Sequence, residues 1–252
     1  MKNLTKVVCL VAVCCCFCLV ACGQKKSKSQ PKGGGKSSVA FTKDVAGIDV
    51  SRYQGNVNWE KVKKTLPKGS FVYVKCTEGA TYIDPKCKTL AKGAKASGYR
   101  VGGYHFFRMS SSAHEQFRHF KKILDAIGPD LIPMVDVELD VDLKGASQKK
   151  IHRAQDSLQV LLNLLEKAYG VKPIIYGTQR SYNTYCAPRF NHYTLYIGRY
   201  GQNKPVINGP SHYTIWQFTE NGKIDGIEKP VDFCRFHPEK SMKDILLPKK
   251  RK

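Results

Sequence analysis

The sequence lacks several of the features that assign a protein to a common class. Outside the amino-terminal leader, no pair of cysteines shows a zinc-type Cys-x-x-Cys spacing and no adjacent pair of histidines completes a ligand set, so we expect no metal site. We find no internal repeat and no recognisable nucleic-acid-binding motif. Acidic residues are scarce, because 20 Asp and Glu stand against 42 Lys and Arg, which gives a formal net charge of +22. This excess indicates an anionic partner, and the missing motif argues against a nucleic acid.

Long apolar runs are also missing, apart from one at the amino terminus. A basic start precedes the apolar run Val7 to Val20, which is shorter than the roughly 20 residues that a membrane span needs. The run leads into Leu19-Val20-Ala21-Cys22, which resembles the lipobox of bacterial lipoproteins, where the leader is cleaved before an acylated cysteine. We therefore predict a lipoprotein signal peptide at residues 1–21 and lipidation of Cys22. The alternative is a plain secretory signal or an uncleaved anchor, and it also places the rest of the chain outside the cytoplasm.

The remaining chain divides into a tether, one domain and a tail. Residues 22–43 are rich in Lys, Ser, Gln and Gly, so they cannot bury enough apolar surface to offset their conformational entropy. Residues 44–240 are expected to hold one packed core, since 42% of the chain is hydrophobic and 10% aromatic. Residues 241–252 end in a basic run that we interpret as a solvated tail. The predicted location is the cell envelope, with the protein held outside the cytoplasm by its lipid; the leaflet is left open, the outer membrane included.

Cysteines are concentrated in the leader, and four lie in the predicted domain. These four are Cys76, Cys87, Cys186 and Cys234. In an oxidising compartment they could form two disulfides, with three possible pairings. Buried free thiols are the alternative, and the sequence leaves both open.

Short β-rich runs alternate with helical patterns along the domain. The early runs are Val45 to Val50, Phe71 to Cys76, Arg100 to Phe106 and Ile132 to Val137. Amphipathic helices fit between them, around Phe120 and Leu124 and then around Leu158 and Leu162. Later runs, separated by Gly, Pro and Asn with less room for helices, are Pro173 to Tyr176, Leu195 to Gly198, Tyr213 to Phe218 and Val231 to Phe233. We predict an α/β fold, a TIM-like (β/α) barrel whose outer helices are reduced or missing in the carboxyl-terminal half.

Polar and acidic residues recur where the predicted strands end. In a parallel barrel all these ends meet at one mouth, where active sites lie. The residues are Asp49, Glu78, His105, Asp136, Glu138 and, on the last strand, Asp232. We favour a hydrogen-bonded wall role for His105 over that of a base, and Cys76 and Cys234 are interpreted as small buried hydrophobes rather than nucleophiles.

The segment Met134-Val135-Asp136-Val137-Glu138 carries two acids on one strand. Side chains alternate along a strand, so both acids point to the same face with α-carbons about 7 Å apart. Two close carboxylates cannot both ionise freely, so one can stay protonated near neutral pH and act as a general acid. Glycoside cleavage requires such an acid next to a second carboxylate.

The chain resembles the lysozymes of glycoside hydrolase family 25, from about Val45 to Phe236. The stretches that carry the resemblance are Gly47-Ile48-Asp49-Val50-Ser51, Gln54-Gly55, Val74-Lys75-Cys76-Thr77-Glu78-Gly79, Gly103-Tyr104-His105-Phe106, Asp136-Val137-Glu138, Ile215-Trp216-Gln217-Phe218, Gly226-Ile227 and Val231-Asp232. No single stretch is specific, but the set in this order is.

The resemblance implies a role for each matched residue. Glu138 would be the general acid and Asp136 its partner, which would orient or stabilise the 2-acetamido group of the substrate. Asp49 and Asp232 would flank them at the same mouth. Residues implied to line the sugar groove are Glu78, Tyr104, Tyr176, Trp216 and Gln217. The implied reaction is hydrolysis of the β-1,4 bond between N-acetylmuramic acid and N-acetylglucosamine in peptidoglycan, without a cofactor, and we leave retention or inversion open.

Three rival functions are kept. One is a non-catalytic wall-binding module on the same fold, which would lack one of the acids; none is missing. Another is a hydrolase of chitin or a different polysaccharide, which only the resemblance excludes. The last is a cationic nucleic-acid-binding protein, which export disfavours. The expected partners are peptidoglycan strands and, through the lipid, a membrane, and we expect a monomer. The positive charge suits an anionic cell wall.

Overall fold

The computed structural model describes residues 38–248, which contain the predicted domain. The predicted leader at residues 1–21, the lipidation site Cys22, the tether as far as residue 37 and residues 249–252 lie outside this range.

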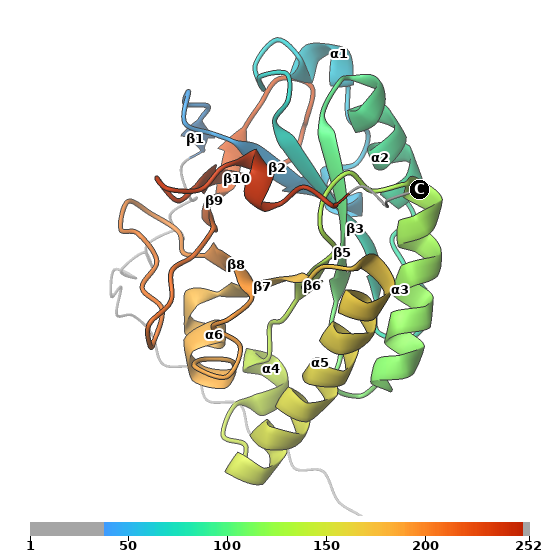
Figure 1. Cartoon of the computed structure of the whole chain (residues 1–252). Coiled ribbons are helices and arrows are strands. Elements are labelled where there is room, and N and C mark those ends of the chain that lie inside the picture. Colours follow the sequence, from blue (N-terminus) through green and yellow to red (C-terminus); the bar gives the residue numbers. More distant parts are fainter. Residues whose placement is uncertain (1–37, 249–252) are drawn as a thin grey trace, which may run out of the picture. The chain divides into compact units, whose positions relative to one another are not determined.

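Eight strands close into a barrel (Figure 1). They are β2 (Gly47–Val50), β3 (Phe71–Glu78), β5 (Arg100–Phe106), β6 (Met134–Asp136), β7 (Ile174–Thr178), β8 (Thr194–Gly198), β9 (Ile215–Lys223) and β10 (Val231–Phe236). Neighbours from β2 to β9 run parallel, and β10 closes the barrel by pairing with both β9 and β2. Two short strands lie outside the ring: β1 (Val39–Ala40) pairs with β9, and β4 (Tyr82–Ile83) pairs with β3.

Helices cover the barrel unevenly along the chain. They are α1 (Trp59–Val62), α2 (Cys87–Ala96), α3 (Ala113–Ile127), α4 (Asp140–Leu143), α5 (Gln148–Tyr169) and α6 (Gln179–Tyr185), with 3-10 turns η1 (Arg52–Gln54) and η2 (Met242–Asp244). Between β8 and β9, and between β9 and β10, the described chain forms no helix. This confirms the predicted barrel with missing outer helices in its second half. Within residues 38–248 we find no helix with the length and apolar character needed to cross a membrane.

The wall of the barrel separates two apolar cores. The outer core lies between strands and helices, where Phe120 and Leu124 of α3 and Leu158 and Leu162 of α5 are fully buried. The inner core fills the barrel with aromatic rings such as Phe71, whose centroid lies 6.0 Å from that of Tyr73 and 6.3 Å from that of Tyr196. A packed interior leaves room for a site only at an end of the barrel.

The last strand runs against the parallel arrangement expected from the sequence. β10 is antiparallel to both neighbours, so its amino end, and not its carboxyl end, lies at the mouth. Asp232 is the second residue of β10 and pairs in register with Asp49. The predicted parallel direction of the last strand is therefore wrong, but Asp232 still lies at the mouth of the barrel.

The four cysteines within the described residues are buried free thiols. Of the two alternatives left open by the sequence, the structure has thiols rather than disulfides. Cys76 on β3 and Cys87 at the start of α2 come closest, with their sulfur atoms 3.3 Å apart in the outer core.

Candidate active site

A cavity of about 250 Å³ opens at the carboxyl ends of the parallel strands. Twelve residues line it: Asp49, Gln54, Tyr104, Met134, Asp136, Glu138, Tyr176, Tyr200, Gln217, Glu220, Pro230 and Asp232. Five of the twelve are carboxylic acids, and none is a lysine, an arginine or a histidine. The chain has a net charge of +22, so a cavity lined by acids and by no basic side chain differs sharply from the rest of the protein.

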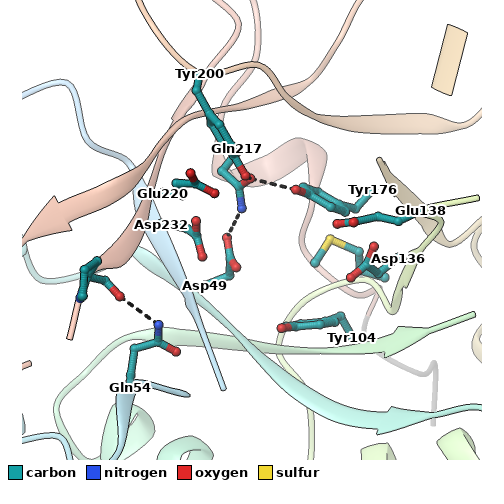
Figure 2. Close-up of a pocket in the computed structure, with 12 residues that line it drawn as sticks. Asp49, Gln54, Tyr104, Asp136, Glu138, Tyr176, Tyr200, Gln217, Glu220 and Asp232 are labelled. Carbon is teal, nitrogen blue, oxygen red and sulfur yellow. Dashed lines mark hydrogen bonds between the residues drawn. The ribbon is translucent and has the colours of Figure 1, made fainter. Parts of the chain in front are cut away.

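Asp136 and Glu138 form one acid pair, at the end of β6 (Figure 2). Asp136 is 7% exposed, and its Oδ1 has no hydrogen-bond partner among the described residues. Burial, and next the charge of Glu138, raise the pKa of Asp136 well above its usual range. Glu138 is half-buried, two residues beyond Asp136. Two such acids hold one proton between them more readily than they both ionise.

Asp49 and Asp232 form a second acid pair, across the cavity from the first (Figure 2). Asp49 Oδ2 accepts hydrogen bonds from Tyr196 Oη and Gln217 Nε2, each at 2.9 Å. Burial raises the pKa of Asp49, and the bond from Gln217 opposes that shift. Burial, followed by the charge of Asp49, raises the pKa of Asp232 to about 9. This pair therefore also carries a proton at neutral pH.

Gln217 connects the second acid pair to the tyrosines of the cavity. Its Oε1 accepts a hydrogen bond from Tyr176 Oη at 2.7 Å and another from Tyr200 Oη at 3.2 Å. Its Nε2 donates to Asp49, so the amide orientation is fixed from both ends. Tyr104 and Tyr176 line the cavity and supply flat apolar faces beside the acids.

Trp216 lies outside the cavity, which corrects the prediction that it lines the sugar groove. Successive side chains of β9 point to opposite faces, so Gln217 faces the cavity and Trp216 faces the outer core. The indole is 3% exposed, donates from Nε1 to Arg199 O at 2.6 Å and lies 5.0 Å from the guanidinium of Arg235.

Glu78 is not among the residues that line the cavity, so the structure does not bring it together with the acids. It ends β3, and both of its carboxylate oxygens are occupied by cations. Lys75 Nζ lies 2.7 Å from Oε2, and Arg108 Nη2 lies 2.6 Å from Oε1. Partial burial raises the pKa of Glu78, but the hydrogen bonds and charges of Lys75 and Arg108 together outweigh it and hold that pKa below its usual value.

His105 and Cys234 are structural neighbours of the site rather than reactive groups. His105 is fully buried, with Nδ1 2.8 Å from Thr77 Oγ1 and Nε2 3.0 Å from Gln116 Oε1, which confirms its interpretation as a hydrogen-bonded residue. Burial lowers the pKa of His105 to about 4. The thiol of Cys234 contacts Asp49 and Tyr196, and burial raises its pKa.

Three polar cavity residues were not assigned from the sequence: Gln54, Tyr200 and Glu220. Tyr200 follows the end of β8 by two residues, so the strand-end rule could have found it. Gln54 belongs to a motif already singled out, and its Nε2 donates to Pro230 O at 2.9 Å across the mouth. Glu220 lies on the part of β9 that extends beyond the predicted strand, so the sequence carried no signal for it.

The arrangement suits proton transfer to a leaving group. Within the described part of the chain, no three His, Cys, Asp or Glu side chains are placed to share a metal ion. The cavity instead offers two pairs of acids with tyrosine faces beside them. One carboxylic acid that donates a proton and a nearby carboxylate that stabilises positive charge are the requirements of glycoside hydrolysis.

Comparisons with known proteins agree with this chemistry. A sequence model of glycosyl hydrolases family 25 matches residues 48–227. The Escherichia coli K12 protein YegX is 34% identical over 196 residues, which cover 77% of this chain and 70% of that protein. Lysozyme M1 of Streptomyces globisporus is 28% identical over 208 residues, covering 79% and 69%. The solved structure of a family 25 glycosyl hydrolase from Bacillus anthracis superposes with a TM-score of 0.71 and 28% identity, covering 84% of this chain and 97% of that one.

The matched segment contains the barrel from β2 to β9 and four of the five cavity acids, Asp49, Asp136, Glu138 and Glu220. The family model matches most of the chain, and a solved member of the family has the same barrel. The chain therefore belongs to glycosyl hydrolases family 25.

Proposed function

We propose that this protein is a lysozyme that hydrolyses the β-1,4 bond between N-acetylmuramic acid and N-acetylglucosamine in peptidoglycan. The observation that carries the proposal is the Asp136–Glu138 pair at the barrel mouth, two acids on one strand end that line the same cavity, where burial and the charge of Glu138 raise the pKa of Asp136. Its similarity to Lysozyme M1 supports the choice of substrate.

Glu138 is the proposed general acid, and Asp136 its partner. Glu138 is the less buried of the two, so it can reach the glycosidic oxygen of a bound strand. The unpartnered Oδ1 of Asp136 suits the N–H of a 2-acetamido group. That bond would favour the ionised form of Asp136 and leave the shared proton on Glu138, where it is needed.

Asp49 and Asp232 are proposed to tune the site rather than to transfer the proton. Gln217 and Tyr196 donate hydrogen bonds to Asp49 and restrain it, which suits a group that shapes the field of the cavity. Tyr104, Tyr176 and Gln217 are proposed to contact sugar rings and hydroxyls.

Digestion of purified peptidoglycan followed by mass spectrometry of the products tests this function. We expect products with N-acetylmuramic acid at the reducing end. Reducing-end N-acetylglucosamine, or cleavage of chitin but not of peptidoglycan, would overturn the proposal. Proton NMR of the first anomer released decides between retention and inversion.

We also propose that the protein is a lipoprotein, held in the cell envelope by an acylated Cys22 and active as a monomer. The lipobox-like Leu19-Val20-Ala21-Cys22 supports this. A single acyl chain anchors a protein only marginally, so the several chains usual for lipoproteins would be needed. Labelling with a clickable fatty acid is the test: we expect label on the wild type and none on Cys22→Ser, and label that persists on the variant would reject acylation at this position.

A further inference from the structure

Outside the active site, a second cavity of about 580 Å³ lies between α1 and α2. Its lining is mostly apolar, with Val57, Trp59 and Leu90 among the lining residues. Lys88 and Lys92 stand on its α2 side, and both are exposed. We refer to this cavity as the Trp59 groove.

The indole of Trp59 fits the groove because α2 has a glycine where the ring lies. A Cβ atom on Gly93 would come within 2.2 Å of Trp59 Nε1, closer than side chains can approach. A glycine in a helix interior costs about 1 kcal/mol relative to alanine. The sequence accepts that cost at Gly93, where the ring lies against the helix, and the half-buried indole lines the groove.

The lysines of α2 carry a charge that the helix does not neutralise. Lys88 and Lys92 are one turn apart, a spacing at which like charges repel, and α2 contains no acidic residue. Among residues 38–248, neither ammonium group has an ion-pair or hydrogen-bond partner, whereas Lys86 of the same region donates to Asn56 Oδ1 at 2.7 Å. A flat aromatic ring beside two unneutralised cations is complementary to a sugar ring with an anionic substituent.

The groove also adjoins the catalytic cavity through one short segment. Gln54 lines the catalytic cavity, and the next three residues, Gly55 to Val57, line the groove. Gly55 has φ of 66°, and a Cβ atom there would touch nothing within 4 Å, so the chain turns sharply and leaves its outer side open. A polymer that leaves the catalytic cavity past Gln54 can therefore continue over Gly55 into the groove.

We infer that the Trp59 groove is a second binding site for the peptidoglycan strand, in which Trp59 contacts a sugar ring and Lys88 and Lys92 attract carboxylates of the muramic acid substituents. The inference rests on the proposed function, because it concerns the same polymer. The site would hold long strands or intact walls and would contribute nothing to the hydrolysis of short fragments that end within the catalytic cavity.

Binding to insoluble peptidoglycan, stripped of teichoic acid, tests the inference. Glu138→Gln serves as the background, so that the polymer is not consumed. In this background we expect Lys88→Glu/Lys92→Glu and Trp59→Ala each to weaken binding on the order of tenfold. Lys149→Glu/Lys167→Glu changes the net charge equally on exposed lysines of α5 and is expected to bind as the background does. Gly93→Ala, which displaces the ring without a change of charge, is expected to follow Trp59→Ala.

Several outcomes separate the groove from the proposed function. Equal loss of binding in the Lys88/Lys92 and Lys149/Lys167 variants would mean that total charge, not the groove, holds the wall. Unchanged binding in both Lys88→Glu/Lys92→Glu and Gly93→Ala would overturn the site, even if Trp59→Ala fails to fold. Binding that appears only with teichoic acid present would also overturn it. If the wild type releases no muropeptides while the groove variants still lose binding, the proposed function fails and the groove stands.

Activity on a short soluble glycan fragment provides the positive control. For this assay Glu138 is left unchanged. The Lys88→Glu/Lys92→Glu variant is then expected to cleave the fragment at the wild-type rate and to cleave intact walls more slowly than the wild type. An equal loss on both substrates would place these lysines in the catalytic cavity and contradict the inference.

Discussion

The two acid pairs of the active-site cavity are built in different ways. Asp136 and Glu138 come from one strand, two residues apart, so their spacing is set by local backbone geometry. Asp49 and Asp232 come from strands 183 residues apart in the chain and are neighbours because β10 pairs with β2 in register. Asp49 accepts two hydrogen bonds at 2.9 Å, whereas Asp136 keeps a buried oxygen without a partner among the described residues.

The difference indicates which pair is prepared for substrate. A buried acceptor without a partner costs about 1–3 kcal/mol of stability, so it is retained where a ligand will supply the donor. A pair whose hydrogen bonds are already made by protein groups has less to gain from substrate. We therefore expect the first pair to control the rate and the second pair to control stability and its pH dependence.

The largest expected effect is that of Glu138→Gln on hydrolysis. The amide has nearly the same volume but cannot donate the acid's proton, so turnover of peptidoglycan is expected to fall by about 10² to 10⁴. Release of soluble muropeptides measures it, with circular dichroism to check that the variant is folded. Wild-type turnover by a folded Glu138→Gln protein would contradict its role as the general acid.

Asp136→Asn is expected to have a smaller but still severe effect. The amide keeps an oxygen acceptor but loses the negative charge, and a hydrogen bond to a charged group contributes about 1.5–3 kcal/mol. The rate is therefore expected to fall by about 10- to 100-fold. A variant that lost less than Asp49→Asn would reverse the proposed division between the pairs.

Asp49→Asn is expected to retain most of the activity. The amide oxygen can still accept from Tyr196 and Gln217, so the orientation of the neighbouring groups survives. We expect a loss of less than about tenfold, since only the field of the cavity changes. The same muropeptide assay applies, and a loss as large as that of Glu138→Gln would assign Asp49 a direct part in bond cleavage.

Asp232→Asn is expected to change the pH dependence of stability rather than the rate. The pKa of Asp232 is about 9 in the folded protein, above its ordinary value of 3.8, so between these pH values the folded state holds a proton that the unfolded state has lost. The free energy of unfolding therefore falls as pH rises through this window. Between pH 6.5 and pH 9, Tm is expected to fall less in Asp232→Asn than in the wild type.

Asp225→Asn is the matched control, because Asp225 is exposed and lies in the same region of the chain. It should follow the wild-type curve. Identical Tm curves for the wild type and Asp232→Asn would show that the second pair carries no proton of its own at neutral pH.

Elements with a strong local pattern could be predicted from the sequence. The strand predicted at Arg100 to Phe106 has these bounds in the structure, and the leucines at Leu158 and Leu162 lie on the buried face of α5. The acids at strand ends were found because parallel strands bring their ends to one edge. These features depend on alternation and helical spacing, which the residues themselves display.

Other features depended on information that alternation does not carry. A strand pattern is the same in both directions, so the reversal of β10 could not be predicted. In a barrel both faces of a strand are buried, and the sequence therefore gave no reason to place Gln217 inside and Trp216 outside. The ion pairs that occupy Glu78 involve Arg108, which lies 30 residues further along the chain.

The reversed strand β10 has a consequence for how the chain tolerates insertions. β10 follows β9 after only residues 224–230, and its pairing with β2 sets Asp232 opposite Asp49. A shift of one residue in that pairing would turn Asp232 to the outer face. The connection between β8 and β9, residues 199–214, fixes no comparable register between acids. We therefore expect added residues to be tolerated better in the 202–209 segment than in the turn at 224–230, because the pairing of Asp232 with Asp49 depends on the length of that turn.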